Sequence, residues 1–431
     1  MYRHWGESSP YAELTTENLQ YLTLPNAIQD LVNFARTADL PFDPFHTSAA
    51  PRAPWLLSGG SYSGALTAWT ASVAPGTFWA YTASSAVVET IDDFWQYFQP
   101  IQEGLPQNCT TDLEAVIPYI DNILENGTPE EQYELKSMFG LGALEHNDDF
   151  GAAIENGPWL WQSLQFYGGD YVYQFCDAVE GVTANTTTIP GPGGVGVEKA
   201  LAGYAEWFNT TYLPGACAGY GYWTDEYSIA CFDTYNASSP MYTDVSVGNS
   251  VDRQWEWMLC NQPFDYWQDG APEGTPTIVS RLVTAEYWQR QCGLYFPPEN
   301  GHAYDASGAT VATTNSYTGG WDMTTEKNIP RLLFVNGQHD PWRDSTVSSD
   351  FRPGGPLGST TENPVFVIPD GIHCSDLLAK NGQVNAGVQA VINAEIAQVK
   401  TWIGQFPKGG FPGWPAGQPF PTGQGLPGSW W

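Results

Sequence analysis

The stretch Trp55-Leu-Leu-Ser-Gly-Gly-Ser61-Tyr-Ser-Gly64 decides the fold of this chain. A short apolar run leads into two glycines and a serine, and a helix-compatible segment starts at Ala65. A serine on a sharp strand-to-helix turn, a nucleophile elbow, presents its hydroxyl above a sheet. The G-x-S-x-G consensus is met at Gly59 and Ser61, whereas Ser63 stands where the last glycine is usual. The stretch therefore indicates a serine nucleophile, although a glycine-rich turn without a catalytic role would look the same in isolation.

The segments around this turn predict an α/β sheet. Residues 54–58, 78–83, 331–335 and 364–368 are short apolar runs of the kind that a parallel sheet buries on both faces. Apolar residues recur with helical spacing over residues 17–38 and 387–406. Strand and helix signals thus alternate at both ends of the chain. We expect the sheet core in residues 1–90 and 328–406, a mainly helical cap inserted at residues 91–327, and an irregular Gly/Pro-rich tail at residues 407–431.

Two later loops supply partners for the serine. Asp340 follows the run at 331–335, and His373 follows the run at 364–368. A serine hydroxyl becomes a good nucleophile when a histidine takes its proton and a carboxylate orients that histidine. The order serine, acid, histidine, with each residue after a strand, suits this type of sheet. We therefore predict Ser61 as nucleophile, Asp340 as orienting acid and His373 as general base.

Two neighbouring residues offer alternatives that we disfavour. His339 adjoins Asp340, but one loop would then supply both the acid and the base. Cys374 adjoins His373, but adjacent residues on an extended strand point apart, so we expect a buried spare thiol.

The charge of the chain limits its partners. Fifteen Lys and Arg residues against 47 Asp and Glu give a net charge of −32, which repels nucleic acid and anionic membranes. The excess of carboxyl groups has two explanations. It can reflect adaptation to an acidic medium, where protonation relieves the charge repulsion, or selection for solubility alone. The segment His146-Asn-Asp-Asp149 has carboxylates without a second histidine at ligand spacing, so we predict neither a metal nor a cofactor.

Cysteines and sequons point to an oxidising compartment. Six cysteines lie between Cys109 and Cys292 and allow up to three disulfides, in pairings that the sequence leaves open. Five N-x-[ST] sequons accompany them, at Asn108, Asn126, Asn185, Asn209 and Asn236. No apolar run approaches the roughly 20 residues that span a bilayer. We expect a secreted or vacuolar–lysosomal protein, although no signal peptide follows Met1.

Four blocks of this sequence resemble the S28 serine peptidases, and most closely the fungal acid prolyl endopeptidases among them. They are Tyr2-Arg-His-Trp-Gly-Glu-Ser-Ser-Pro-Tyr11, Gly59-Gly-Ser-Tyr-Ser-Gly64, Asn336-Gly-Gln-His-Asp-Pro-Trp342 and Gly371-Ile-His-Cys-Ser-Asp-Leu377. The resemblance implies an α/β-hydrolase core under a helical insertion, and hydrolysis after proline at acid pH, by either an endopeptidase or a Pro-X carboxypeptidase. It also implies that the Tyr62 N–H donates to the oxyanion and that Trp342 walls the proline pocket.

The resemblance also leads to one expectation about the pKa of His373 and one about the start of the chain. A histidine base must be neutral, so activity in acid requires a His373 pKa below the ordinary value of about 6.5, as burial would favour. The chain also begins where four strands of an α/β-hydrolase should already have passed. We therefore expect a truncated chain with an exposed sheet edge, poor folding and low activity. An ester hydrolase on the same scaffold and a catalytically silent relative remain alternatives.

Overall fold

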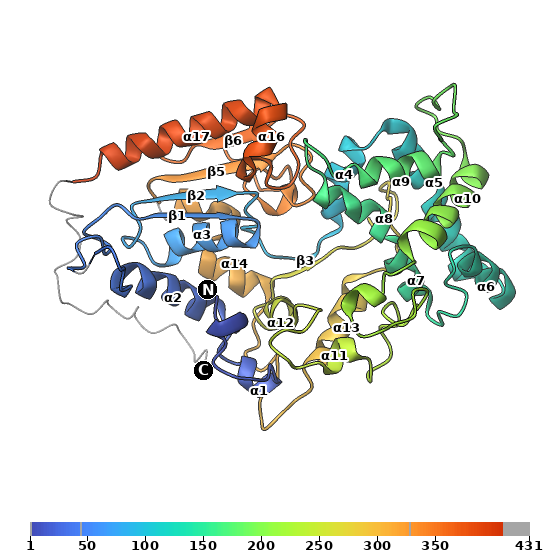
Figure 1. Cartoon of the computed structure of the whole chain (residues 1–431), viewed down its shortest axis with the longest axis horizontal. Coiled ribbons are helices and arrows are strands. Elements are labelled where there is room, and N and C mark those ends of the chain that lie inside the picture. The colour runs from blue at the N-terminus through green and yellow to red at the C-terminus, as the bar shows by residue number, and fades with distance from the viewer. Residues whose placement is uncertain (1, 44, 327–328, 408–431) are drawn as a thin grey trace.

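The sheet at the centre of the protein has four parallel strands in the order β1-β2-β5-β6 (Figure 1). The computed structural model describes residues 2–43, 45–326 and 329–407. The strands are β1 (Leu56–Gly60), β2 (Ala80–Ser84), β5 (Leu332–Gly337) and β6 (Val365–Ile368). All four predicted strands and the α/β class are confirmed, with strand ends displaced by up to two residues. The register pairs Gly60 with Ser84 and Gly337 with Ile368, so the carboxyl ends of the strands share one edge.

Helices cover both faces of this sheet (Figure 1). On one face lies α3 (Tyr62–Val73), which is buried from Gly64 to Ser72. The other face carries α17 (Ala386–Gly404), whose first turn is capped because Asn385 Oδ1 accepts from the N–H groups of Gly387 and Val388. Val388 and Trp402 of α17 pack against the strands in a second small core. The helix predicted at residues 387–406 is therefore confirmed.

The helix predicted over residues 17–38 is wrong in one respect, because two helices occupy this segment. They are α1 (Thr16–Leu19) and α2 (Leu24–Thr37). Thr23 starts the second helix, since its side chain accepts from the Asn26 N–H, and proline lies in the first turn. A cap followed by a proline favours a fresh helix start over continuation of the preceding helix. The apolar spacing continues across the break and hid it from the sequence pattern.

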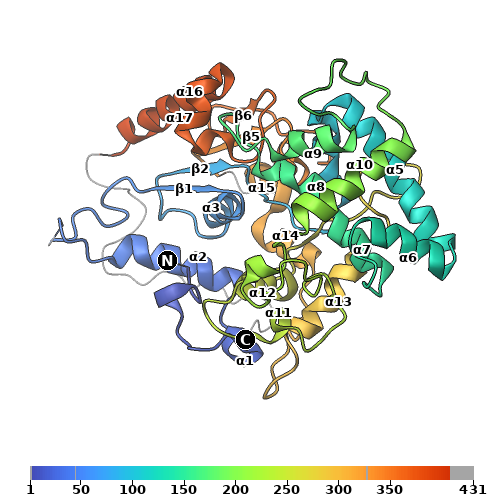
Figure 2. The same ribbon diagram turned by 45° about the vertical axis from the view of Figure 1, so that its right-hand side comes forward.

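Residues 91–326 form mostly helices beside the sheet, and we call this segment the cap (Figures 1 and 2). One short parallel strand pair, β3 (Ile91–Asp93) with β4 (Asp265–Trp267), was not predicted. The α-helices are α4 (Gln99–Gly104), α5 (Gln107–Asn126), α6 (Pro129–Met138), α7 (Asn147–Ile154), α8 (Asn156–Trp159), α9 (Tyr171–Val179), α10 (Val197–Trp207), α11 (Pro240–Thr243), α12 (Arg253–Asn261), α13 (Ala285–Tyr295), α14 (Val311–Thr318) and α15 (Met323–Glu326). Helix α14 packs on α3, so the cap and the sheet share a continuous core. The tail predicted at residues 407–431 lies outside the described residues beyond residue 407.

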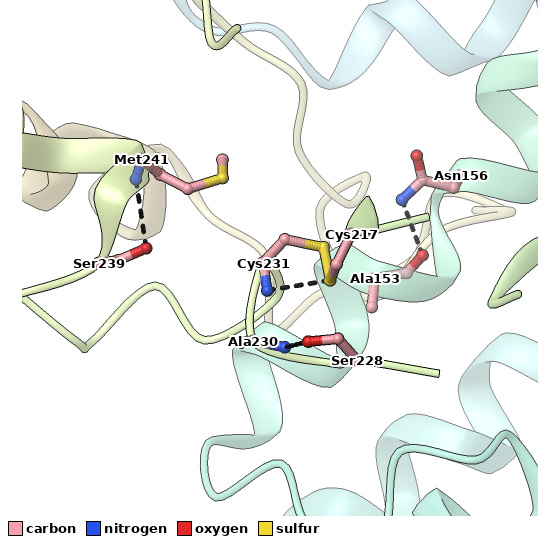
Figure 3. Close-up of a disulfide and its surroundings, with 8 residues drawn as sticks. All are labelled: Ala153, Asn156, Cys217, Ser228, Ala230, Cys231, Ser239 and Met241. Atoms are coloured by element: carbon pink, nitrogen blue, oxygen red, sulfur yellow. Dashed lines mark hydrogen bonds between the residues drawn. A yellow bond between two sulfur atoms is a disulfide. The ribbon is translucent and has the colours of Figure 1, made fainter. Parts of the chain in front are cut away.

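Three disulfides cross-link the cap, as the even cysteine count predicted. Cys109–Cys176 joins α5 to α9, and Cys260–Cys292 joins α12 to α13. Cys217–Cys231 closes a loop next to Ala153, Asn156 and Met241 (Figure 3). Cys374 is a free thiol.

The strand that carries the predicted nucleophile lies at the sheet edge. Strands β2 and β5 are buried along their whole length, whereas β1 alternates between exposed and half-buried residues. Among the described residues, no helix is both long and apolar enough to cross a bilayer.

Candidate active site

Ser61 occupies a strained turn between β1 and α3. Its backbone has φ 58° and ψ −130°, in the left-handed half of conformational space that residues with a side chain rarely adopt. Two glycines permit this turn. A Cβ on Gly59 would lie 2.1 Å from the Ser63 carbonyl oxygen, and one on Gly64 would lie 2.7 Å from the Ser84 carbonyl oxygen. The elbow therefore has the geometry that its sequence predicts.

Ser63 replaces the usual glycine because its side chain faces solvent. The close approach of α3 to β2 falls one residue later, at Gly64, so a hydroxymethyl group at position 63 meets no obstacle. This explains why the consensus can be broken here without loss of the turn.

Tyr62 is the first residue of α3, and its N–H therefore has no helical carbonyl one turn before it. Such an N–H, next to the nucleophile, is free to point at a developing oxyanion. The phenol ring is fixed from several sides. Its hydroxyl shares a 2.6 Å hydrogen bond with Tyr2, and the ring packs on Trp255 with centroids 5.2 Å apart. The N-terminal segment and α12 of the cap thus both hold the elbow.

His373 and Asp340 come together as predicted from the sequence. His373 Nδ1 lies 2.9 Å from Asp340 Oδ1, and the same oxygen accepts from the Trp342 N–H, also at 2.9 Å. Asp340 is completely buried, and only 9% of the His373 surface is exposed. A carboxylate on Nδ1 fixes the ring orientation and leaves Nε2 as the basic nitrogen.

The pKa of His373 is raised above its ordinary value, in the opposite direction from the expectation. Burial lowers the pKa of this imidazole, as we argued from the sequence. The Asp340 carboxylate outweighs burial through its charge and its hydrogen bond, and the neighbouring Cys374 thiol adds to the increase. A buried carboxylate in contact stabilises the imidazolium more than lost hydration destabilises it.

His339 and Cys374, the two alternatives that we disfavoured, do not take part in the contact between His373 and Asp340. The His339 Nε2 lies 3.7 Å from an Asp370 oxygen, so it faces away from the acid next to it in sequence. Cys374 lies on a left-handed turn with φ 54° and ψ 34°, not on an extended strand. Our geometric reason against a role for Cys374 was therefore wrong, because the thiol lies close enough to raise the pKa of His373.

Trp342 lines a cavity of about 250 Å³ and lies near the His373 ring. The two ring centroids are 6.5 Å apart. The Trp342 Nε1–H donates to Gln162 Oε1 at 2.9 Å, which anchors the indole to the cap. The cavity walls are mainly aromatic: Trp159, Trp255, Tyr266, Trp267, Trp288, Tyr295 and Trp342. A larger cavity of about 620 Å³ shares Trp159, Trp288 and Tyr295 with the first and reaches the Cys217–Cys231 disulfide (Figure 3).

The other predicted positions are spread over the cap. Asn126, Asn185 and Asn236 are exposed and Asn209 is half-buried, while Asn108 donates from Nδ2 to Glu180. The segment containing His146 is not arranged as a metal site. His146 stacks on Tyr235 with centroids 3.5 Å apart. Within the described parts of the chain, no group of three or more His, Cys, Asp or Glu side chains could hold a metal ion.

Two residues at this site escaped sequence reasoning. Gln162 anchors Trp342 from a part of the cap without a recognisable motif. Asp376 contacts the last residue of β2, since Ser84 Oγ donates to its Oδ1 at 2.6 Å. A signal for Asp376 was present, because it lies in the block Gly371–Leu377 that also contains the predicted base.

Comparison with known proteins agrees with this architecture. The family model for serine carboxypeptidase S28 matches residues 2–391. The chain is 43% identical over 411 residues to the serine protease vicPa of Bipolaris victoriae, which covers 94% of this chain and 75% of the relative. It is 30% identical over 396 residues to a probable extracellular serine carboxypeptidase of Arthroderma benhamiae, over 86% of this chain and 52% of the relative. A mouse thymus-specific serine protease is 25% identical over 394 residues, or 87% of this chain and 68% of the relative. The chain therefore belongs to the S28 family of serine peptidases.

Proposed function

We propose that this serine peptidase hydrolyses peptide bonds on the carboxyl side of proline, through an acyl-enzyme on Ser61. His373 Nε2 takes the proton from Ser61 Oγ as the hydroxyl attacks the scissile carbonyl. Asp340 holds the ring through Nδ1 and stabilises the imidazolium that forms, in keeping with the 2.9 Å contact. The Tyr62 N–H donates to the oxyanion. The imidazolium then protonates the leaving amine, and water releases the acyl group by the same steps in reverse.

The position of Trp342 carries the proline part of this proposal. Its indole lines the aromatic cavity, and its ring centroid lies 6.5 Å from that of His373. A proline ring is flat and apolar, and it packs well on an aromatic face. Gln162, which accepts from the indole N–H, also accepts from the Tyr97 hydroxyl at 2.7 Å and so holds two walls of this region.

We further propose that the protein works outside the cell in an acidic medium. The net charge of −32 supports this, because acid lowers the charge repulsion. Burial raises the pKa of both Glu89 and Asp265 to about 7, so these carboxyls stay neutral in mild acid. The His373–Asp340 pair limits how far the working pH can fall, since the raised imidazole pKa withdraws the base in acid. Three disulfides and a relative named as extracellular support secretion.

The test is hydrolysis of N-blocked prolyl chromogenic peptides between about pH 4 and 8. We expect cleavage after proline that Ser61→Ala abolishes. Trp342→Ala should lower kcat/KM for proline at the cleavage site by about 10-fold relative to alanine there, because an aromatic contact contributes up to about 1.5 kcal/mol. Cleavage of a short-chain ester without cleavage of any prolyl peptide would instead identify an ester hydrolase. A chain inert on both, and unreactive toward a serine-directed phosphonate, would be a silent relative.

A further inference from the structure

Three residues with positive φ meet at the carboxyl edge of the sheet. Ser61 follows β1 with φ 58°, Ser85 follows β2 with φ 44°, and Cys374 lies beyond β6 with φ 54°. Strained backbone of this kind persists only where the surrounding structure holds it, and it is concentrated at functional sites. The turn at Ser61 carries the proposed nucleophile, the turn at Cys374 adjoins the proposed base, and Ser85 follows the strand next to β1, so what holds these turns bears on catalysis.

Hydrogen bonds through Ser84 and Ser85 tie these turns together. On one side, the Ser61 N–H donates to the Ser84 carbonyl oxygen at 2.9 Å. On the other side, the Cys374 N–H donates to Ser85 Oγ at 2.9 Å, and Ser84 Oγ donates to Asp376 Oδ1 at 2.6 Å. The Ser85 N–H donates to the Val335 carbonyl oxygen within β5, at 2.7 Å. The nucleophile turn is thus bonded to Ser84, and the histidine loop is bonded to Ser84 and to Ser85 next to it.

This link matters because the nucleophile and the base are not directly joined. Among the described residues, no hydrogen bond connects the Ser61 hydroxyl to the His373 ring, and such bonds often tighten only when substrate binds. The distance between Ser61 and His373 is therefore set by the backbone segments to which their two turns are hydrogen-bonded. Gly60 and the histidine loop also pack closely, since a Cβ on Gly60 would lie 3.2 Å from Cys374 Sγ.

We propose that Asp376 is a positioning residue of this active site: through Ser84 it fixes the nucleophile turn relative to the histidine loop. The proposal rests on the proposed function, because it assigns Asp376 a role in the reaction of Ser61 with His373. Asp376 touches neither the substrate nor the reacting atoms in this scheme. It acts on the Ser84 segment, whose carbonyl oxygen holds the Ser61 N–H.

The surroundings of Asp376 fit a defined, charged role. Only 7% of its surface is exposed, and its second oxygen Oδ2 has no hydrogen-bond partner among the described residues. Three titratable groups interact with it electrostatically: the bonded pair of Asp340 and His373 and, on α17, Glu395. Burial raises the pKa of Asp376 to about 6, against the lowering effects of Ser84 and His373. By reciprocity, its negative charge raises the pKa of His373.

A purely structural carboxylate provides the matched comparison. In the cap, Asp121 Oδ1 accepts from Ser280 Oγ at 2.6 Å, and 6% of the Asp121 surface is exposed. Asp121 and Asp376 thus share burial, bond length and partner type, but Asp121 does not touch the turns around Ser61. If Asp376 only stabilises the fold, the two positions should respond alike to substitution.

The experiment measures how fast a fluorophosphonate labels Ser61 in the full chain, a reaction that forms a phosphorus–oxygen bond to Oγ and releases fluoride. Asp376→Ala should slow labelling by about 10- to 100-fold, the effect of a displaced catalytic group. Asp376→Asn keeps an acceptor for Ser84, so its rate should recover to within about threefold of the unmodified chain, while the midpoint of its pH profile moves to lower pH because a negative charge near His373 is gone. Asp121→Ala should lower the melting temperature comparably and leave labelling unchanged.

The outcomes separate the two proposals. If the unmodified chain is not labelled, the proposed function fails. Amide hydrogen exchange at Ser61 then tests the positioning role by itself. That role predicts faster exchange in Asp376→Ala than in Asp121→Ala. If Asp376→Ala folds and labels at the unmodified rate, or exchanges no faster than Asp121→Ala, the positioning role is refuted. If Asp376→Ala does not fold, Ser84→Ala replaces it, and normal labelling of Ser84→Ala would refute the role equally.

Discussion

Glu155, between α7 and α8, should make the stability of this protein fall as the pH rises. Its side chain is completely buried, and neither carboxyl oxygen has a hydrogen-bond partner among the described residues. Burial, followed by the charges of Asp269 and Asp121, raises its pKa well above the ordinary value of a glutamate. The folded protein therefore keeps a proton on Glu155 that the unfolded chain loses in mild acid. Between the two pKa values the folded state binds more protons, so raising the pH favours unfolding.

The size of this effect follows from proton linkage alone. A group protonated only in the folded state changes the free energy of unfolding by about 1.4 kcal/mol per pH unit. From pH 5 to pH 7 the loss amounts to about 2.5 kcal/mol, because the unfolded carboxyl is already mostly ionised at pH 5. Glu155→Gln has nearly the same shape and does not titrate. Any cost of burying the amide of Glu155→Gln changes the free energy of unfolding of the variant by the same amount at every pH.

The assay is urea unfolding of the unmodified chain and of Glu155→Gln at pH 5, 6 and 7. Relative to the unmodified chain, the variant should gain about 2.5 kcal/mol between pH 5 and pH 7. Glu134→Gln on the exposed surface of α6 is the matched control and should show a constant difference. A difference between Glu155→Gln and the unmodified chain that does not change with pH would refute the reasoning, since it would mean that Glu155 is ionised in the folded protein or not buried.

Three further predictions concern local geometry. Gly64→Ala should cost about 1–3 kcal/mol and slow Ser61 labelling, because its Cβ would lie 2.7 Å from the Ser84 carbonyl oxygen; Gly293→Ala on α13, where a Cβ meets nothing within 4 Å, should do neither. Removing Cys109–Cys176, with a sequence separation of 67, should cost about 1.4 kcal/mol more than removing Cys217–Cys231, with a separation of 14, in thermal unfolding; equal losses would exclude the loop-closure explanation. Glycopeptide mass spectrometry after secretion from a fungal host should find glycans on the exposed Asn126, Asn185 and Asn236, and full occupancy of Asn108 would contradict the bond that holds its amide to Glu180.

The sequence predicted those parts of the fold that depend on local pattern. The four strands, the helix after the histidine loop and the elbow each follow from residues close together in the chain. The split between α1 and α2 was missed because the apolar spacing runs through it, although Thr23 and Pro25 mark a new helix start. The β3–β4 pair was missed because its strands are short and far apart in sequence.

The site was predictable in its residue types and unpredictable in its energetics. Order and spacing place Asp340 and His373 after neighbouring strands, and the structure brings their side chains to 2.9 Å. Nothing in the sequence gives the bond from Ser84 to Asp376 or the anchoring of Trp342 by Gln162, because both contacts join segments distant in the chain. Disulfide pairing was open for the same reason.

The sign of the His373 pKa shift shows what sequence reasoning lacks. Burial was foreseeable from a cap over the sheet, and burial alone lowers an imidazole pKa. Contact with the Asp340 carboxylate reverses the sign, so the base is withdrawn by acid while Glu155 and its neighbours make the fold most stable there. In such a peptidase, acid stabilises the fold through Glu155 and limits the activity through His373. Under the proposed function, its working pH is a compromise between the protonation of buried carboxyls in the cap and the deprotonation of one histidine, and substitutions at Glu155 and at Asp376 should move the two limits separately.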